Sequence, residues 1–214
     1  MTSLERVSSF IKSYIKDDEG ILGEIYSDAI SNGVPIMRPE TKEFIKTQLL
    51  LKKPISILEI GTAVGYSSLY FSQYISLEAH ITTIELDEER ADIACANIKR
   101  MKKENQITVI RGDAYEVLGK LESDAYDFVF VDAAKGQYIN YLEDVLRVTK
   151  KDGLIISDNI LQDGEILESH FLVEKRNRTI HDRMRQYVYA LFNDERLEST
   201  VLSVGDGIGV SIKK

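Results

Sequence analysis

The chain has 214 residues, of which 43% are hydrophobic and 29% are charged, and its formal net charge is −8. This length and composition are typical of one globular domain and exclude a disordered chain. The single cysteine excludes a disulfide framework and a cysteine-based zinc site, and it favours a cytoplasmic location. The acidic balance argues against a protein that coats nucleic acid, and no apolar run is long enough to cross a membrane.

The first 53 residues have a helical pattern and form a segment ahead of a core at residues 54–214, within one domain spanning 1–214. Apolar residues on one face predict a first helix: Leu4, Val7, Phe10, Ile11 and Tyr14. A second helix is predicted at about 20–31 and a third at about 40–52. Between them, "NGVPIMRPE" contains glycine and prolines that predict a loop.

From residue 55 onward, strands and helices alternate. Strands are predicted at 55–60, 80–86, 107–112, 126–132 and 153–159, with helices after each, including 87–103, 137–149 and about 174–193. Two closing strands, 197–204 and 207–213, join through a tight glycine turn as an antiparallel hairpin. This order predicts an α/β, Rossmann-like fold: a seven-stranded, mostly parallel sheet with helices on both faces and extra N-terminal helices. Cys95 falls mid-helix, where a small core residue is expected.

Ligands of such sheets bind at the carboxyl ends of the strands. The first strand ends in "LEIGTAVGYSS", where Gly61 and Gly65 bracket a turn that lets the backbone approach a ligand. The second ends in Glu85, placed to accept hydrogen bonds from a ribose, and the third is followed by Asp113. Without a pyrophosphate fingerprint, this set favours an adenosine ligand lacking phosphates, namely S-adenosylmethionine. The alternatives are simple turn glycines and helix N-caps at Glu85 and Asp113.

The fourth and fifth strands end in "VD" and "SDN", which supply Asp132, Asp158 and Asn159. Two carboxylates and an amide oxygen at neighbouring strand ends form a hard ligand set that suits Mg²⁺. The alternative for the second pair is a helix cap or an Asx turn. The three histidines show no paired spacing, and no chemistry is predicted for them.

The motifs "LEIGTAVGYSS", "VDAAKGQY" and "ISDNIL" resemble those of the cation-dependent O-methyltransferases of the catechol and caffeoyl-CoA type. The resemblance covers nearly the whole chain. Within that family, "GVPIM", "DAAKGQY" and "VGDGIGVSIKK" are most similar to the branch that methylates 5-hydroxyuridine in bacterial tRNA. The plant enzymes carry other residues at Ala133-Ala134, so their substrate specificity does not transfer.

The resemblance implies a role for each matching position. Asp132, Asp158 and Asn159 match the metal ligands, and Lys135 matches the lysine that serves as general base. Cofactor contacts are implied for a longer set: Met37, Glu59, Gly61, Gly65, Ser67, Glu85, Asp113, Ala114 and Asp132. Family members pair as homodimers, which is the expectation for this chain too.

Methyl transfer from a sulfonium requires a deprotonated oxygen aimed at the methyl carbon. A metal that binds two adjacent substrate oxygens lowers the hydroxyl pKa and fixes its position, and a nearby base removes the proton. Asp132 is expected to hold this metal and Lys135 to take the proton. A catechol offers such an oxygen pair, and so does 5-hydroxyuridine.

The segment "EKRNRTIHDRMRQY" (174–187) carries five positive and two negative residues in an acidic protein. This pattern favours phosphate binding, with candidate RNA contacts at Arg38, Arg176, Arg178 and Arg183. The alternative is a solvated helix face or a subunit contact.

Two tyrosines in or near these motifs, Tyr138 and Tyr187, either stack on a base or belong to the core. The substrate is therefore expected to be tRNA, with a small catechol-like molecule as the alternative. A non-catalytic nucleotide-binding domain is disfavoured because Asp132, Lys135, Asp158 and Asn159 are all intact.

Overall fold

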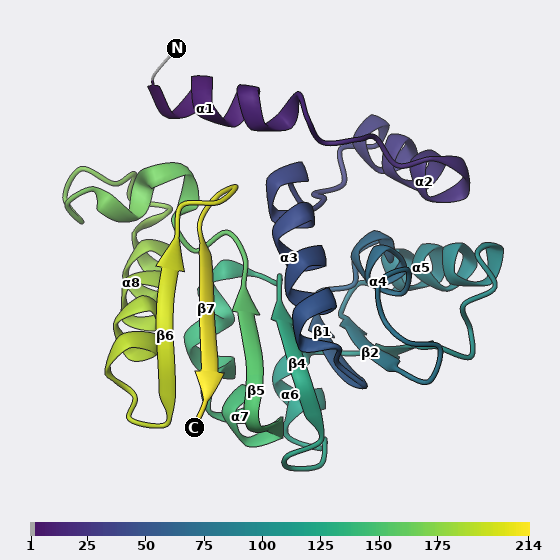
Figure 1. Cartoon of the computed structure of the whole chain (residues 1–214). Coiled ribbons are helices and arrows are strands. Elements are labelled where there is room, and N and C mark those ends of the chain that lie inside the picture. Colours follow the sequence, from purple (N-terminus) through teal and green to yellow (C-terminus); the bar gives the residue numbers. More distant parts are fainter. Residues whose placement is uncertain (1–2) are drawn as a thin grey trace.

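The computed structural model describes the backbone of residues 3–214 and the side chains of residues 6–162 and 164–214. A seven-stranded sheet lies at its centre, with helices on both faces (Figure 1). The strands are β1 (Ser56–Ile60), β2 (His80–Glu85), β3 (Ile107–Arg111), β4 (Tyr126–Val131), β5 (Thr149–Ser157), β6 (Leu197–Leu202) and β7 (Ile208–Lys213). Their spatial order is β3-β2-β1-β4-β5-β7-β6, and the first five are parallel. β7 is antiparallel to both neighbours, as predicted for the hairpin.

The helices are α1 (Ser3–Lys12), α2 (Gly20–Ser31), α3 (Pro39–Lys52), α4 (Tyr66–Phe71), α5 (Glu88–Arg100), α6 (Ala114–Leu118), α7 (Tyr138–Val148) and α8 (Arg178–Asn193). Two short 3₁₀ helices, η1 (Lys135–Gln137) and η2 (Gln162–Leu167), follow β4 and β5. The predicted fold class is thereby confirmed. None of the helices in the described part of the chain combines the length and apolar character needed to span a membrane.

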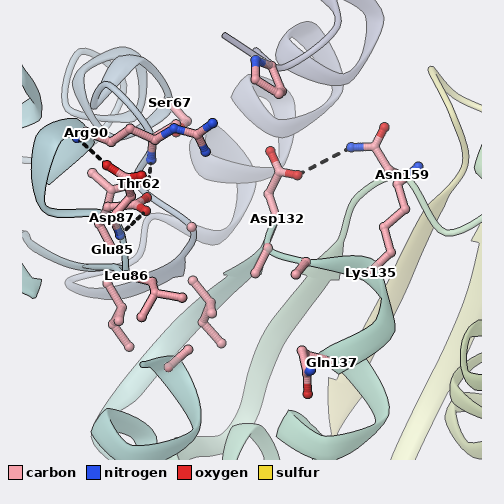
Figure 2. A pocket seen from close by; sticks show the side chains of 18 of the residues that line it. Thr62, Ser67, Glu85, Leu86, Asp87, Arg90, Asp132, Lys135, Gln137 and Asn159 are labelled. Carbon is pink, nitrogen blue, oxygen red and sulfur yellow. Dashed lines mark hydrogen bonds between the residues drawn. The ribbon is translucent and has the colours of Figure 1, made fainter. Parts of the chain in front are cut away.

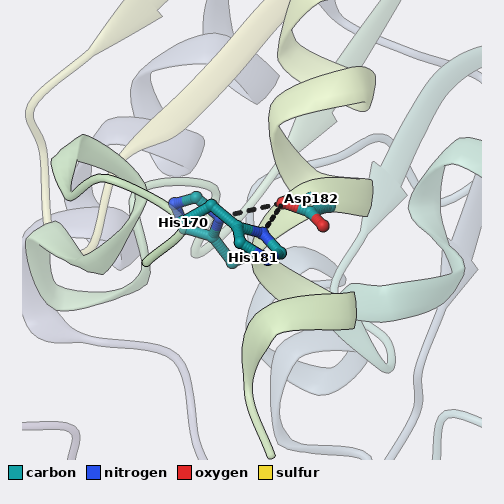
Figure 3. A group of neighbouring side chains, drawn as sticks. All are labelled: His170, His181 and Asp182. Atoms are coloured by element: carbon teal, nitrogen blue, oxygen red, sulfur yellow. Dashed lines mark hydrogen bonds and ion pairs between the residues drawn. The ribbon is translucent and has the colours of Figure 1, made fainter. Parts of the chain in front are cut away.

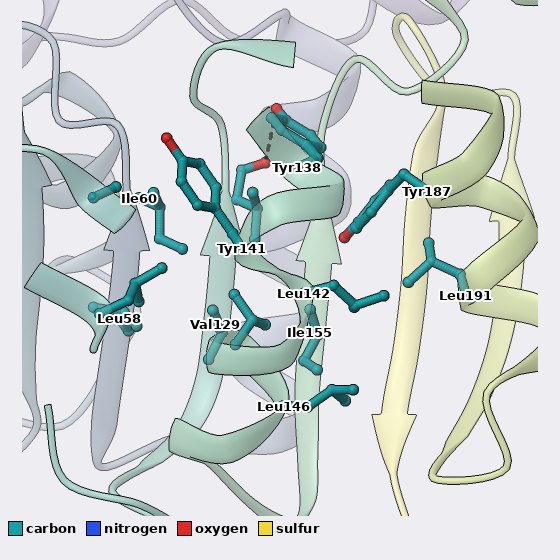
Figure 4. Close-up of a cluster of buried hydrophobic side chains, with 14 of the residues drawn as sticks. Leu58, Ile60, Val129, Tyr138, Tyr141, Leu142, Leu146, Ile155, Tyr187 and Leu191 are labelled. Carbon is teal, nitrogen blue, oxygen red and sulfur yellow. Dashed lines mark hydrogen bonds between the residues drawn. The ribbon is translucent and has the colours of Figure 1, made fainter. Parts of the chain in front are cut away.

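Alternate residues of the central strands face two separate cores. On β1, Leu58 packs on the face covered by α6, α7 and α8 (Figure 4), whereas Ile57 packs on the face covered by α2, α3 and α4. Both side chains are fully buried. Strands covered on both faces read as continuous apolar runs, which explains "YDFVFV" in β4. Because β1 to β5 run parallel, their carboxyl ends lie at the same edge of the sheet.

Three local predictions differ from the structure. α8 begins at Arg178 rather than near 174, because the preceding residues form turns. β5 begins at Thr149 rather than at 153, because Thr149 pairs with Tyr126 before an irregularity in the register. The polar sequence "KKDG" is typical of a loop, so the sequence did not predict this part of the strand. Cys95 is exposed, and its assignment to the core was wrong: the helical repeat of α5 turns Ala91, Ala94 and Ile98 inward instead.

The described part of the apolar face predicted for the first helix is largely exposed, and the side chain of Leu4 lies outside the described residues. Val7, Phe10, Ile11 and Tyr14 are between 46% and 73% exposed. In Figure 1, α1 lies apart from the sheet, beyond the carboxyl ends of the parallel strands. A cluster of large apolar side chains that are exposed to solvent is typical of a protein interface.

Candidate active site

A crevice of about 1460 Å³ opens at the carboxyl edge of the sheet (Figure 2). Its wall contains ten of the residues that the sequence singled out: Met37, Arg38, Gly61, Ser67, Glu85, Asp113, Ala114, Asp132, Lys135 and Asn159. They come from the loop before α3 and from the ends of successive strands. The fold thus brings together residues that are more than a hundred positions apart in the sequence, as the shared edge of parallel strands requires.

The glycine turn after β1 is shaped by close packing. Gly61 has φ +105°, and a Cβ placed there would lie 2.0 Å from the backbone oxygen of Asp132. Only glycine tolerates this contact, so the ends of β1 and β4 stay pressed together. Gly65, with φ +83°, precedes α4 and packs against Ala94 rather than lining the crevice.

Glu85 joins two loops of the crevice. Its Oε2 accepts a hydrogen bond from the Ala63 amide at 2.7 Å, and its Oε1 accepts one from the Asp87 amide at 2.9 Å. Asp87, not Glu85, is the N-cap of α5. Glu85 therefore sits at the strand end as a fixed carboxylate facing the crevice, the arrangement that suits a ribose diol. Asp113 both lines the crevice and caps α6, accepting from the Tyr115 amide at 2.9 Å.

Glu59 lies beneath the crevice instead of in its wall. The carboxylate is fully buried and accepts hydrogen bonds from the hydroxyls of Ser67, Ser68 and Thr83. Burial raises its pKa to about 7, although the three hydroxyls act in the opposite direction. Glu59 thus orients Ser67 and the start of α4 from behind, and of these two residues only Ser67 lines the crevice.

Replacing Glu59 with glutamine is expected to remove a pH dependence of stability. A carboxyl group whose folded pKa is raised stabilises the fold fully below its unfolded pKa, near 4.5, and loses that contribution as pH rises through about 7. Between these pH values, we expect the free energy of unfolding of the wild type to fall relative to Glu59→Gln by on the order of 3 kcal/mol. Urea unfolding of both proteins at pH 4.5, 6 and 8 measures this. A difference that does not change with pH would contradict it.

The predicted metal ligands lie together at the ends of β4 and β5. Asp132 Oδ1 accepts from Asn159 Nδ2 at 3.3 Å, and Asp158 Oδ1 accepts from the Asn159 amide at 2.8 Å. Asp158 is 1% exposed and lies behind the crevice wall, and its Oδ2 has no hydrogen-bond partner among the described residues. Asn159 adopts a left-handed conformation (φ +59°), which asparagine tolerates better than most residues.

The charges of this acidic pair require compensation. Burial raises the pKa of Asp132, and burial together with the Asp132 charge raises that of Asp158. A buried carboxylate with one unsatisfied oxygen, next to a half-buried one, fits a hard divalent cation, which would accept the free lone pairs and offset both charges. The donor set of Asp132, Asp158 and Asn159 therefore matches the magnesium site expected from the sequence.

Lys135 stands at the entrance to this centre, on η1. Its Nζ lies 3.2 Å from Asp206 Oδ2, and its side chain is about one third exposed. Asp206 lines the crevice from the turn between β6 and β7. The sequence reasoning missed it, because "GDG" between two strands has a sufficient explanation as a hairpin turn. Only the structure shows that this turn residue is buried, at 4% exposed.

The arginines proposed for RNA binding are not equivalent. Arg38 lines the crevice, and Arg183 donates to the Gly136 carbonyl at 3.1 Å, beside it. Arg178, the first residue of α8, donates to the carbonyls of Val173 and Phe171 in the preceding connection. Arg176 is 81% exposed and pairs with Glu174 at 2.8 Å.

The two tyrosines considered for base stacking belong to the core. Tyr138 and Tyr187 are both about 1% exposed, and their rings meet edge to face, 5.5 Å apart (Figure 4). The Tyr138 hydroxyl lies within hydrogen-bond distance of the carbonyls of Val131 and Asp158. These rings position the strand ends and offer no face to a base.

A parallel sheet with a glycine turn, a strand-end glutamate and an acidic pair at one edge defines a Rossmann-like enzyme for a nucleoside cofactor. The sequence model of the O-methyltransferase family matches residues 12–214, and the chain belongs to this family. It is 26% identical to a catechol O-methyltransferase of Niastella koreensis, over 98% of this chain and 97% of that protein. The expected enzyme class, an S-adenosylmethionine-dependent O-methyltransferase of the catechol and caffeoyl-CoA type, is confirmed.

Solved structures agree. A Staphylococcus aureus protein assigned as a caffeoyl-CoA O-methyltransferase superposes with a TM-score of 0.87 at 31% identity, covering 97% of this chain and 98% of that one. An O-methyltransferase of Bacillus cereus in complex with SAH has the same fold, with a TM-score of 0.85 at 24% identity, covering 98% and 97%.

Proposed function

We propose that this enzyme is a magnesium-dependent methyltransferase acting on the 5-hydroxyl of 5-hydroxyuridine at the tRNA wobble position, giving 5-methoxyuridine. The observation that carries the metal dependence is the unsatisfied Oδ2 of Asp158, which lies behind the crevice wall that Asp132 and Asn159 line. A substrate with two adjacent oxygens fits such a site, because both can bind one cation.

The cofactor side of the crevice is assigned by position. S-adenosylmethionine supplies a methyl group on a sulfonium, which is transferred as the sulfur–carbon bond breaks and an oxygen–carbon bond forms. Glu85 would accept hydrogen bonds from the ribose, and Asp113 with Ala114 would flank the adenine. Met37 and Ser67 would contact the methionine end, with Glu59 holding Ser67 in place.

The substrate side consists of the acidic centre and Lys135. Asp132, Asp158 and Asn159 would hold Mg²⁺, which when bound makes the substrate hydroxyl more acidic and orients it. As a neutral amine, Lys135 Nζ takes the hydroxyl proton and becomes an ammonium, which the nearby Asp206 carboxylate stabilises at the crevice wall. The deprotonated oxygen is then the nucleophile that attacks the methyl carbon.

The RNA substrate is supported by basic residues on both sides of the start of α8. Arg183 contacts the η1 turn that carries Lys135. Lys175 and Arg176 are exposed just before α8, where Arg176 also pairs with Glu174. A small catechol is the second candidate, supported by the catechol and caffeoyl-CoA names of the relatives and by the net charge of −8.

A homodimer in the cytoplasm is proposed as the acting form. The apolar side chains of α1 support self-association, since Val7, Phe10 and Ile11 are 46–64% exposed. The cytoplasmic location follows from the tRNA substrate and the cysteine content.

Bulk tRNA from cells lacking this protein, incubated with the pure enzyme, S-adenosylmethionine and Mg²⁺, tests the substrate. We expect mass spectrometry of the nucleosides to show loss of 5-hydroxyuridine and a matching gain of 5-methoxyuridine. The double variant Lys175→Glu/Arg176→Glu replaces two positive charges by two negative ones, and its activity on tRNA is expected to fall at least about tenfold. Catechol methylation by the same variant should be unchanged.

The matched control is Lys120→Glu/Lys151→Glu. It makes the same change in net charge at two exposed lysines outside the crevice wall and the basic segment. Equal losses in both double variants would attribute the effect to net charge. Unchanged tRNA nucleosides together with efficient catechol methylation would replace the RNA substrate by a small molecule.

A further inference from the structure

Two histidines and an aspartate meet where the connection after η2 passes the first turns of α8 (Figure 3). His170 belongs to the connection, whereas His181 and Asp182 belong to α8. One potential ligand atom from each of the three lies within 4.8 Å of the others. None of the three lines the catalytic crevice. The cluster is therefore separate from the site described above.

The hydrogen bonds of His181 determine where its protons lie. Its imidazole is 1% exposed, and Nε2 lies 3.1 Å from the carbonyl oxygen of Glu168. A carbonyl oxygen only accepts, so Nε2 must carry the hydrogen, and Nδ1 of the neutral ring has a lone pair. That lone pair faces Asp182 Oδ1 at 3.3 Å. Two acceptors facing each other repel, so a proton or a metal cation must lie between them.

The same carboxylate oxygen also faces the second histidine. His170 Nδ1 lies 2.8 Å from Asp182 Oδ1, and this contact lowers the pKa of the Asp182 carboxyl. The neighbouring arginines point elsewhere: Arg178 and Arg183 donate to backbone carbonyls. Within the described part of the chain, the ion pairs of Asp182 involve the two histidines alone. Its charge is thus available to a cation at this point.

We propose that His170, His181 and Asp182 form a zinc site, with water as the fourth ligand. Two imidazole nitrogens and one carboxylate oxygen are a set that zinc prefers, and tetrahedral ligands about 2 Å from zinc lie about 3.3 Å from one another. The separations of 3.3 Å and 2.8 Å from Asp182 Oδ1 are close to that value. The Glu168 carbonyl takes the role of the outer partner that fixes the orientation of a ligating histidine.

The position of this site links it to the catalytic turn. Arg183, the residue after Asp182, donates to the carbonyl of Gly136, which lies in η1 next to Lys135. A zinc ion would tie the connection carrying His170 to the start of α8, and α8 in turn holds η1. The site is thus a structural tie that steadies the entrance to the crevice, whichever substrate the enzyme takes.

Zinc binding to the full-length protein without a histidine tag tests the proposal. The protein is equilibrated with Zn²⁺ in excess Mg²⁺, which occupies the hard oxygen site, and then dialysed before its metal content is measured. Cobalt, added in place of zinc, reports imidazole ligands by its visible absorption. The variants are His170→Ala and Asp182→Asn, both at partly exposed side chains. His80→Ala is the control, because His80 contacts Thr108 at the far end of the sheet.

We expect one equivalent of zinc in the wild type and in His80→Ala, and an affinity at least tenfold lower in His170→Ala and Asp182→Asn. Circular dichroism checks that each variant is folded. A wild type that retains no zinc would overturn the proposal and assign the charge between His181 and Asp182 to a proton. Equal zinc binding by wild type and His170→Ala would also overturn it.

Discussion

Replacing Asp158 with asparagine is expected to stabilise the metal-free protein and, at the same time, to lower methyl transfer at least about 100-fold. The first effect follows from the raised pKa of this carboxyl group. Burial and the charge of Asp132 both disfavour its ionised form. Such a group stabilises the fold below its unfolded pKa, near 3.8, and that contribution is lost as pH rises through its folded pKa. At pH 8 the wild type therefore carries a charge that Asp158→Asn does not.

Stabilisation by at least about 1 kcal/mol raises the unfolding temperature of a chain of this size by about 2–4 °C. Addition of Mg²⁺ should reverse the order, because a cation that binds only the folded wild type stabilises it by mass action, by about 2.7 kcal/mol at 100 times its Kd. The loss of activity follows from the loss of one of two charged ligands, which removes several kcal/mol of charge stabilisation.

Thermal unfolding at pH 8, with EDTA and with Mg²⁺, measures both halves of this prediction. The control is Asp152→Asn, which makes the same chemical change at an exposed residue of the same strand. We expect it to leave the Mg²⁺ response and the activity as in the wild type. If Asp158→Asn kept the wild-type response to Mg²⁺, the acidic pair would not be the metal site.

Replacing Lys135 with methionine is expected to lower kcat by about 10²–10⁴-fold, the usual contribution of a general base, while cofactor affinity stays within about threefold. Methionine keeps the apolar stem of the side chain, and Lys135 lies on the acidic side of the crevice, apart from the glycine turn and Glu85 (Figure 2). The loss should also shrink as pH rises, because hydroxide then takes over removal of the substrate proton.

Steady-state kinetics from pH 7 to pH 10 and calorimetric titration with the cofactor provide these readouts. The variant Lys99→Met, on the exposed surface of α5, is the matched control and should behave as wild type. A kcat within about threefold of wild type at pH 7 would remove Lys135 from the mechanism. A loss that stays constant across the pH range would instead assign it to positioning, through its contact with Asp206.

The local sequence predicted the elements best where burial is strongest. "YDFVFV" and "ISILEI" lie between two helical layers, so most of their residues are apolar and buried, although β1 also buries Glu59. The motif residues at these ends were therefore found from the sequence. Weakly amphipathic or polar stretches were placed less accurately: the start of α8 and the beginning of β5 depend on turns and on pairing with a distant strand.

The residues themselves determined that this chain builds a parallel sheet whose edge carries a glycine turn and a row of acids, because these features follow from the alternation of short apolar and polar runs. Only the tertiary structure decided how the acids differ. Glu59 supports the turn from below, Glu85 faces the crevice, and Asp158 sits behind it with one oxygen unsatisfied. It also brought Asp206 to Lys135 and His170 to His181. Burial and long-range contacts depend on how the layers pack, and no local pattern encodes the distance between two side chains far apart in the sequence.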